Sequence, residues 1–129
     1  MALILDTNVL IEAGEQPVGD ADELVAISTV SLAELHYGAL AVSDPDQRAV
    51  RQRILTTVER TFTALPVDAR VAAEWGRLFA AVKARGGKPG KRQLDLGIAA
   101  TAVAHGATLI TYNIKDFMIV EDLVDVRLP

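Results

Sequence analysis

The fold of this chain is decided by the stretch Ala2-Leu3-Ile4-Leu5-Asp6, in which four apolar residues stand directly before an acid. A short apolar run of this length is typical of a buried β-strand. Similar runs recur at residues 25–27, 64–67 and 108–111, with a weaker one at 126–128. We therefore expect four or five strands, with Asp6 at the carboxyl end of the first.

Helical patterns fill the gaps between these runs. Residues 68–85 carry one apolar stripe that includes Trp75, which we expect in the core; Asp68 can cap its start and Gly86-Gly87 can end it. Residues 45–62 repeat apolar side chains at intervals of four, and the alanine-rich segment 93–105 suits a closely packed helix. Strands that alternate with helices imply crossover connections. The pattern predicts a three-layer α/β/α sandwich with a mostly parallel sheet of four or five strands.

The composition is that of a soluble domain. With 129 residues, half of them hydrophobic, the chain is long enough to bury one core, and we expect a single domain over residues 1–129. The absence of cysteine excludes disulfides, thiol catalysis and thiolate metal sites. No apolar run approaches the roughly 20 residues of a membrane span. We expect a cytoplasmic protein that does not contact membranes.

The formal net charge of -4 argues against a protein that binds nucleic acid simply by being basic. The charge is unevenly distributed, however, because the segment 83–94 holds five cations and no acid: Lys83, Arg85, Lys88, Lys91 and Arg92. This segment is either a solvated loop or a local basic patch.

Acidic and amide side chains follow several of the predicted strands. Asp6 ends the first strand, and Glu34 lies at the opening of the helix after the second. Asp95 is near the start of the alanine-rich helix, and Asn113 and Asp116 follow the strand at 108–111. In a parallel sheet these points meet at one edge, which is where open α/β sheets bind ligands.

Carboxylates that meet in a crevice raise one another's pKa values unless a cation neutralises them. With only oxygen ligands on offer, the natural ion is Mg²⁺, with Mn²⁺ as a substitute. Such a site suits the hydrolysis of phosphodiesters.

Each of these side chains also has an ordinary explanation as a helix-start residue. Ser31 and Glu34 fit a capping box, and Asp95 suits the positive end of a helix dipole. Asn113 and Asp116 show the spacing of a cap pair. Only their joint placement indicates a site.

Other chemistries have weaker signals. The sequence holds no Gly-x-Ser-x-Gly nucleophile elbow and no Gly-rich phosphate loop of the Walker or dinucleotide type. A phosphatase with Asp6 as nucleophile is a distant alternative, because position 8 carries Asn8 where many such enzymes have an acid.

Four motifs occur in order along essentially the whole chain. They are Leu-Asp-Thr-Asn-Val-Leu-Ile (5–11), Ile-Ser-Thr-Val-Ser-Leu-Ala-Glu-Leu-His-Tyr-Gly (27–38), Asp-Leu-Gly-Ile-Ala-Ala (95–100) and Leu-Ile-Thr-Tyr-Asn-Ile-Lys-Asp-Phe (109–117). Together they resemble the PIN domain, and more narrowly the VapC-type toxins of toxin–antitoxin pairs. The resemblance implies a metal-dependent endoribonuclease that acts on RNA, for example tRNA, and is neutralised by a cognate VapB-like antitoxin.

The resemblance also implies a set of site residues. Asp6, Glu34 and Asp95 match the family's first three acidic positions, and Asn113 stands where many members have an acid. We therefore assign Asp116, one helical turn further on, as the fourth catalytic and metal-binding residue. The side chains that look like donors orienting these acids are Thr7, Asn8, Thr111 and Asn113.

The resemblance further implies a homodimer and a groove that the antitoxin covers. The amphipathic segment 45–62 is a candidate surface for that partner, although ordinary core packing explains it equally well. The basic segment 83–92 could contact RNA or the antitoxin. The alternative function is a non-catalytic PIN-like module that binds RNA or protein, which the amide at Asn113 keeps open.

Overall fold

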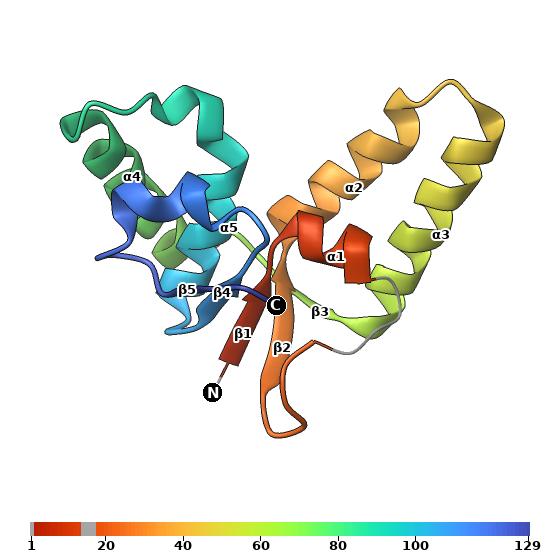
Figure 1. Ribbon diagram of the computed structural model, residues 1–129, viewed down its shortest axis with the longest axis horizontal. Coiled ribbons are helices and arrows are strands. Elements are labelled where there is room, and N and C mark those ends of the chain that lie inside the picture. Colours follow the sequence, from red (N-terminus) through yellow and green to blue (C-terminus); the bar gives the residue numbers. More distant parts are fainter. Residues whose placement is uncertain (1, 14–17) are drawn as a thin grey trace.

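The computed structural model, which describes residues 2–13 and 18–129, is built around one five-stranded sheet (Figure 1). The strand order is β3-β2-β1-β4-β5, and every neighbouring pair is parallel. The strands are β1 (Ala2–Leu5), β2 (Leu24–Ser28), β3 (Thr63–Leu65), β4 (Thr108–Ile110) and β5 (Val126–Arg127). The predicted fold class is confirmed, with the weak candidate at 126–128 present as an edge strand.

Helices cover both faces of the sheet (Figure 1). The α-helices are α1 (Thr7–Ala13), α2 (Thr29–Ala41), α3 (Pro45–Thr61), α4 (Ala69–Ala84) and α5 (Gln93–Ala104), and two 3₁₀ helices are η1 (Pro89–Arg92) and η2 (Ile114–Val120). The helices predicted at 45–62, 68–85 and 93–105 match α3, α4 and α5 to within one residue at each end. Asp68 caps α4 as expected, because its carboxylate accepts a hydrogen bond from Val71 N at 2.9 Å.

The alternation of side chains along β1 separates two cores. Leu3 and Leu5 pack with buried residues of α1 and α3, whereas Ile4 packs with buried residues of α4 and α5. Successive side chains of a strand point to opposite faces of the sheet, so these are the two interfaces of a three-layer sandwich. Trp75 is partly buried against the second core, as the apolar stripe of α4 predicted.

The start of α2 differs from the capping box that the sequence predicted. Ser28 is the N-cap, and its hydroxyl accepts a hydrogen bond from Val30 N at 3.1 Å. Ser31 therefore lies inside the helix and is fully buried, and Glu34 lies beyond the first turn. The capping explanation of Glu34 is wrong, which leaves its carboxylate available for other contacts.

The connection from α4 to η1 is fixed by two adjacent glycines. Gly86 has a φ of 84°, a left-handed conformation that ends α4. A Cβ added to Gly87 would lie 2.7 Å from Val82 Cγ1 and 2.8 Å from Ile119 Cδ1, so only glycine fits there. The loop therefore lies directly against η2. Over the described ranges, no helix has the length and apolarity needed to cross a membrane.

Candidate active site

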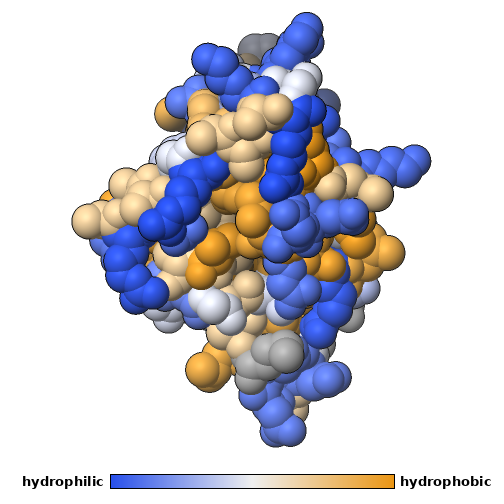
Figure 2. Space-filling view, turned by 90° about the vertical axis from the view of Figure 1, so that its left-hand side faces the viewer, coloured by the Kyte–Doolittle hydropathy of each residue, from blue (hydrophilic) through white to orange (hydrophobic). Residues whose placement is uncertain are grey.

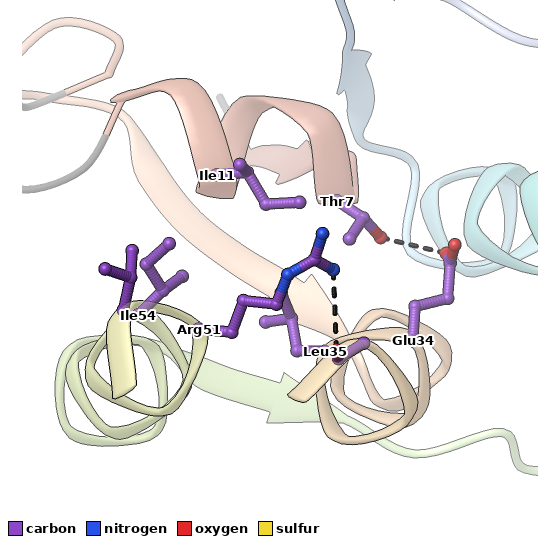
Figure 3. Close-up of a pocket in the computed structure, with 8 residues that line it drawn as sticks. Thr7, Ile11, Glu34, Leu35, Arg51 and Ile54 are labelled. Carbon is purple, nitrogen blue, oxygen red and sulfur yellow. Dashed lines mark hydrogen bonds between the residues drawn. The ribbon is translucent and has the colours of Figure 1, made fainter. Parts of the chain in front are cut away.

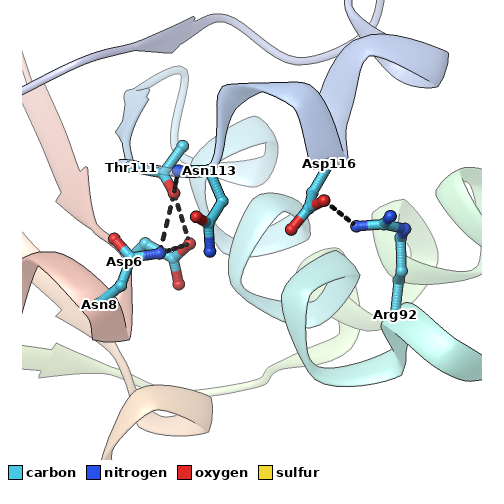
Figure 4. A network of polar contacts seen from close by, with 6 residues as sticks. All are labelled: Asp6, Asn8, Arg92, Thr111, Asn113 and Asp116. Carbon is cyan, nitrogen blue, oxygen red and sulfur yellow. Dashed lines mark hydrogen bonds and ion pairs between the residues drawn. The ribbon is translucent and has the colours of Figure 1, made fainter.

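Asp6 lies just past the carboxyl end of β1 and is 3% exposed. Its Oδ1 accepts a hydrogen bond from Thr7 N at 2.7 Å. Its Oδ2 accepts bonds from the Thr111 hydroxyl at 2.8 Å and from the Asn8 carboxamide at 3.2 Å (Figure 4). Burial raises the pKa of Asp6, and these three hydrogen bonds lower it in part. The carboxylate is thus buried in a fixed orientation.

The Thr111 hydroxyl uses its full hydrogen-bonding capacity around Asp6. It donates to Asp6 and accepts from Asn8 Nδ2 at 3.1 Å and from Asn113 N at 3.0 Å. Asn8 is held in turn, because its Oδ1 accepts from Tyr112 N at 3.1 Å. The network joins the residues after β1 to those after β4, the neighbouring strand.

Glu34 reaches the same place from α2. Its Oε1 accepts a hydrogen bond from the Thr7 hydroxyl at 2.9 Å, and that hydroxyl also lies 3.1 Å from the Ser31 hydroxyl. Burial raises the pKa of Glu34, and the charges of Asp95 and Asp6 raise it further, while the bond from Thr7 opposes them. Thr7 therefore links the first strand to the helix that follows the second.

Asp95 and Asp116 lie on two further helices, α5 and η2. Asp95 is in the first turn of α5, and burial raises its pKa, followed by the charges of Asp6 and Asp116, while Arg92 lowers it. Asp116 is in the first turn of η2 and forms an ion pair with Arg92 at 2.7 Å (Figure 4). These mutual effects show that the four acids share one electrostatic environment.

The predicted cap pair of Asn113 and Asp116 is wrong. Asn113 occupies the cap position of η2, but its side chain makes no capping hydrogen bond. It is exposed and points toward the space between Asp6 and Asp116 (Figure 4). Its amide is thus free to face whatever occupies that space.

Three adjoining cavities are lined by Glu34, Asp95 or Asp116. One of about 380 Å³ is mostly apolar and is lined by Thr7, Ile11, Glu34, Leu35, Gly38, Val50, Arg51 and Ile54 (Figure 3). A second of about 390 Å³ shares Glu34 with it and is also lined by Lys91, Arg92 and Asp95. A third of about 530 Å³ shares those last three residues and adds Asp116. Glu34, Asp95 and Asp116 therefore line one depression formed by these cavities, whereas Asp6 lines none of the three.

The basic segment separates into three residues that face this depression and two that do not. Lys88, Lys91 and Arg92 line the third cavity. Arg85 instead donates to both carboxylate oxygens of Asp122, at 2.7 and 3.1 Å, and to Ile119 O at 2.7 Å. Lys83 is exposed in the last turn of α4 and does not line the cavity.

Two features of the site were not predicted from the sequence. The first is the Arg92–Asp116 ion pair, which depends on how η1 packs near η2. The second is Lys115, which lines the third cavity opposite the basic segment. Its position directly before Asp116 in a site motif was the signal that could have revealed it.

The donor set fits a hard divalent cation. Carboxylate oxygens are the ligands that Mg²⁺ prefers, and three of these acids have pKa values raised by burial and by neighbouring acids, which a cation would offset. Among residues 2–13 and 18–129, no group of three or more acidic or histidine side chains is placed so that it could hold a metal ion by itself. Mg²⁺ does not need such a group, because it keeps several waters and is usually held by one or two carboxylates together with substrate phosphates.

Comparisons with known proteins agree with this arrangement. Residues 3–120 match the model of the PIN domain. Ribonuclease VapC5 of Mycobacterium tuberculosis is 36% identical over 129 residues, which cover 97% of this chain and 92% of that protein. Ribonuclease VapC1 of Rickettsia felis is 30% identical over 132 residues, which cover 95% and 93%.

Solved structures show the same fold. The crystal structure of VapBC-5 from Mycobacterium tuberculosis, a member of a family of toxin–antitoxin systems, matches with a TM-score of 0.78 at 32% identity, covering 98% of this chain and 96% of that one. VapBC2 from Rickettsia felis, bound to a DNA fragment from its promoter, matches with a TM-score of 0.80 at 27% identity, covering 100% and 99%. With its acids at the carboxyl edge of the sheet and its whole length matched, the chain belongs to the PIN-domain family, in the group formed by the VapC ribonucleases.

Proposed function

We propose that this chain is an endoribonuclease toxin that hydrolyses RNA phosphodiesters with Mg²⁺, for which Mn²⁺ can substitute. The observation that carries the proposal is the convergence of Asp6, Glu34 and Asp95 at one edge of the sheet, each with a raised pKa. Perturbed acids in a depression are typical of functional sites. The names of the relatives, which are called ribonucleases, support the same activity.

In this proposal Asp6, Glu34, Asp95 and Asp116 would hold the cation, some of them directly and the others through its waters. A divalent cation bound there would supply Lewis-acid chemistry for phosphodiester hydrolysis. Thr111, Asn8 and Thr7 orient Asp6 through the three hydrogen bonds described above, and Thr7 also orients Glu34. Asn113 faces the same space and is assigned as a hydrogen-bonding partner of a water or a carboxylate.

We assign Asp95 as the general base. Of the four acids it is the one that receives no side-chain hydrogen bond or ion pair from the described residues. It therefore has a carboxylate that no neighbouring donor occupies, which suits a general base. One of its carboxylate oxygens accepts the proton from the water that attacks phosphorus, while the bond from phosphorus to the leaving oxygen breaks and that oxygen takes up a proton from solvent.

We propose a cognate VapB-like antitoxin as the inhibitor, a structured RNA such as tRNA as the substrate, and a cytoplasmic homodimer as the working form. The relatives of known structure are described as toxin–antitoxin systems. The apolar cavity beside Glu34 offers a place for apolar side chains of such a partner (Figure 3). Helix α3 serves two purposes, since Leu55 and Val58 are buried in the core whereas Val50 lines this cavity.

The alternative function is a non-catalytic module that binds RNA or protein. Two observations favour it: position 113 carries an amide, and Arg92 already neutralises Asp116. A binding module would retain RNA or a partner protein in the absence of any divalent cation. The test is therefore metal-dependent cleavage.

The experiment uses the purified chain with a mixed RNA substrate. We expect cleavage with Mg²⁺, none in chelator, and loss of cleavage in Asp6→Ala and Asp95→Ala. Glu12→Gln, an exposed acid on α1 outside the cavities, is the control and retains activity. Full activity of both active-site variants would exclude the mechanism, whereas RNA binding without cleavage under any metal condition would favour the binding module.

A further inference from the structure

The cavity of about 530 Å³ beside Asp116 has an excess of positive charge. Its lining contains four cations, Lys88, Lys91, Arg92 and Lys115, against the two acids Asp95 and Asp116. The chain as a whole carries a formal charge of -4. The local excess is therefore opposite in sign to the rest of the molecule.

The cavity is built from two segments that the fold holds together. Lys88, Lys91 and Arg92 come from η1 and the residue before it, and Lys115 comes from η2. Gly87 brings the first segment into contact with Ile119 of η2, and Arg85 bonds Ile119 O and Asp122. Figure 2 looks onto the α4 side of the molecule and shows long hydrophilic side chains projecting over a partly apolar surface. The cations are thus held around a defined space.

Among the residues that the structure describes, three of these cations have no counterion. Lys88, Lys91 and Lys115 are exposed and form no ion pair with any residue in 2–13 or 18–129. Arg92 is half-buried and paired with Asp116. The three lysines therefore remain available to an external anion.

We propose that this cavity binds a backbone phosphate of the RNA, next to the phosphodiester that is cleaved, through Lys88, Lys91 and Lys115. This inference rests on the proposed function and adds the position of a substrate contact. The cavity shares Lys91, Arg92 and Asp95 with the neighbouring cavity that reaches Glu34, so a strand held here passes the acids. The negative charges of the four acids repel an approaching phosphate, and the positive charges of the lysines offset this repulsion.

The character of the lining favours RNA over an acidic protein segment. Cores of protein interfaces are depleted of charged residues, lysine among them, and are rich in aromatic residues. Interfaces with nucleic acids are far more positively charged and wetter. The apolar cavity at Ile11, Leu35 and Ile54 has the character of a protein interface, whereas the cavity of the lysines does not.

The test measures binding of a fluorescent single-stranded RNA to the full chain by anisotropy in chelator, between about 50 and 200 mM salt. The logarithm of the affinity falls linearly with the logarithm of the salt concentration, and each lysine that neutralises a phosphate of a single strand makes this slope steeper by about 0.7. We expect Lys91→Ala and Lys115→Ala each to reduce this slope by up to about 0.7, and the double variant to reduce it further. Lys91→Arg, which keeps the charge, should retain the slope.

Lys83→Ala and Arg53→Ala are the matched controls, because both remove an exposed cation that does not line the cavity. An equal reduction in the controls would overturn the proposal by showing that binding depends only on total charge. An unchanged slope in the lysine variants would also overturn it. So would lysine variants that bind a polyglutamate peptide more weakly than the parent protein does but bind RNA as the parent does, because the lysines would then recognise an acidic protein segment. A reduced slope in a protein that never cleaves RNA would support the phosphate site while refuting the nuclease proposal.

Discussion

The hydroxyl of Thr111 donates a hydrogen bond to Oδ2 of Asp6 at 2.8 Å, although 105 positions separate the two residues along the chain. The contact follows from the pairing of β1 with β4, which are parallel and place Leu5 beside Ile110. Asp6 N donates to Ile110 O at 2.9 Å, so the ladder continues for one residue past the strands. The sheet itself therefore positions the hydroxyl that orients the central acid.

Replacing Thr111 with valine tests whether this hydroxyl supports activity. The side chain is fully buried, so valine fills the same space but leaves Asp6 without one of its three donors. Loss of a group that orients a metal-binding residue typically lowers metal affinity or activity by about 10- to 100-fold. We expect a decrease of that size in the rate of RNA cleavage.

Thr108→Val is the matched control on the same strand. Thr108 is also buried and donates to Asp125 at 2.7 Å, at the opposite end of β4 from the acids. Its loss removes a comparable hydrogen bond, with a similar effect on thermal stability. If Thr111→Val and Thr108→Val reduce the rate of RNA cleavage by the same factor, Thr111 affects activity only through the stability of the fold.

The three raised pKa values predict an unusual dependence of stability on pH. A carboxyl group whose pKa is higher in the folded protein binds more protons there than in the unfolded chain. Stability then falls as the pH rises above the ordinary value of about 4, until the raised pKa is passed, and the loss persists at neutral pH. In chelator we expect the melting temperature to fall across this interval.

Asp95→Asn should remove part of that loss. Asp95 receives no side-chain hydrogen bond from the described residues, so the amide forfeits no donor, and it relieves the repulsion from Asp6 and Asp116. We expect a higher melting temperature at neutral pH and a shallower pH profile, both measured by circular dichroism in chelator. Mg²⁺ should narrow this difference in melting temperature, because it should stabilise the folded parent more than the variant, which lacks one of the proposed metal-binding carboxylates. A variant less stable than the parent at neutral pH would contradict this reasoning.

Gly97 sets how closely α5 approaches α4. An added Cβ would lie 2.7 Å from Trp75 Cζ2, and the indole cannot easily move because its N–H donates to Gln93 O at 3.0 Å. Overpacking a close contact typically costs about 1 to 3 kcal/mol. We therefore expect Gly97→Ala to destabilise the protein in urea unfolding and, since Asp95 lies two residues earlier, to lower activity.

Gly76→Ala provides the opposite expectation in the neighbouring helix. Nothing lies within 4 Å of a Cβ at Gly76 in α4, so the change brings only the gain in helix propensity. That gain is roughly 0.5 to 1 kcal/mol. If Gly97→Ala stabilised the protein as Gly76→Ala does, α5 would have space for a Cβ beside Trp75, and the close contact inferred here would be wrong.

The sheet and the location of the acids could be predicted because they depend on local patterns. Apolar runs identified every strand, and parallel topology placed Asp6, Glu34 and Asp95 at one edge. Helix α1 was not predicted, because its seven residues are too few to show a clear helical period. The cap of α2 was misplaced because Ser28 and Ser31 both suit a cap, and burial near Thr101, whose hydroxyl lies 3.0 Å from that of Ser28, is invisible in the sequence.

The surroundings of Asp116 depend on tertiary packing. Its ion pair with Arg92 requires the loop after α4 to lie against η2, which Gly87 permits by contact with Ile119. No periodicity reports such a contact between two irregular segments. Sequence patterns therefore located this acid but not its partner.

Asp116 and Asn113 are the two candidates for the fourth position of the proposed metal site. Asp116 acts electrostatically on both Asp6 and Asp95, whereas Asn113 is neutral and exposed. We expect Asp116→Asn to weaken Mn²⁺ binding, measured by calorimetry with catalytic turnover absent, and to lower cleavage by about 10-fold or more. Asn113→Ala should change both by much less.

Asn113→Asp completes this comparison. An acid at position 113 would add a negative charge facing the space between Asp6 and Asp116, which strengthens cation binding but increases repulsion when the cation is absent (Figure 4). We expect tighter Mn²⁺ binding together with a lower melting temperature in chelator. If Asn113→Asp restored the activity lost in Asp116→Asn, the two positions would be interchangeable. If Asn113→Ala alone abolished metal binding, the amide and not Asp116 would complete the site.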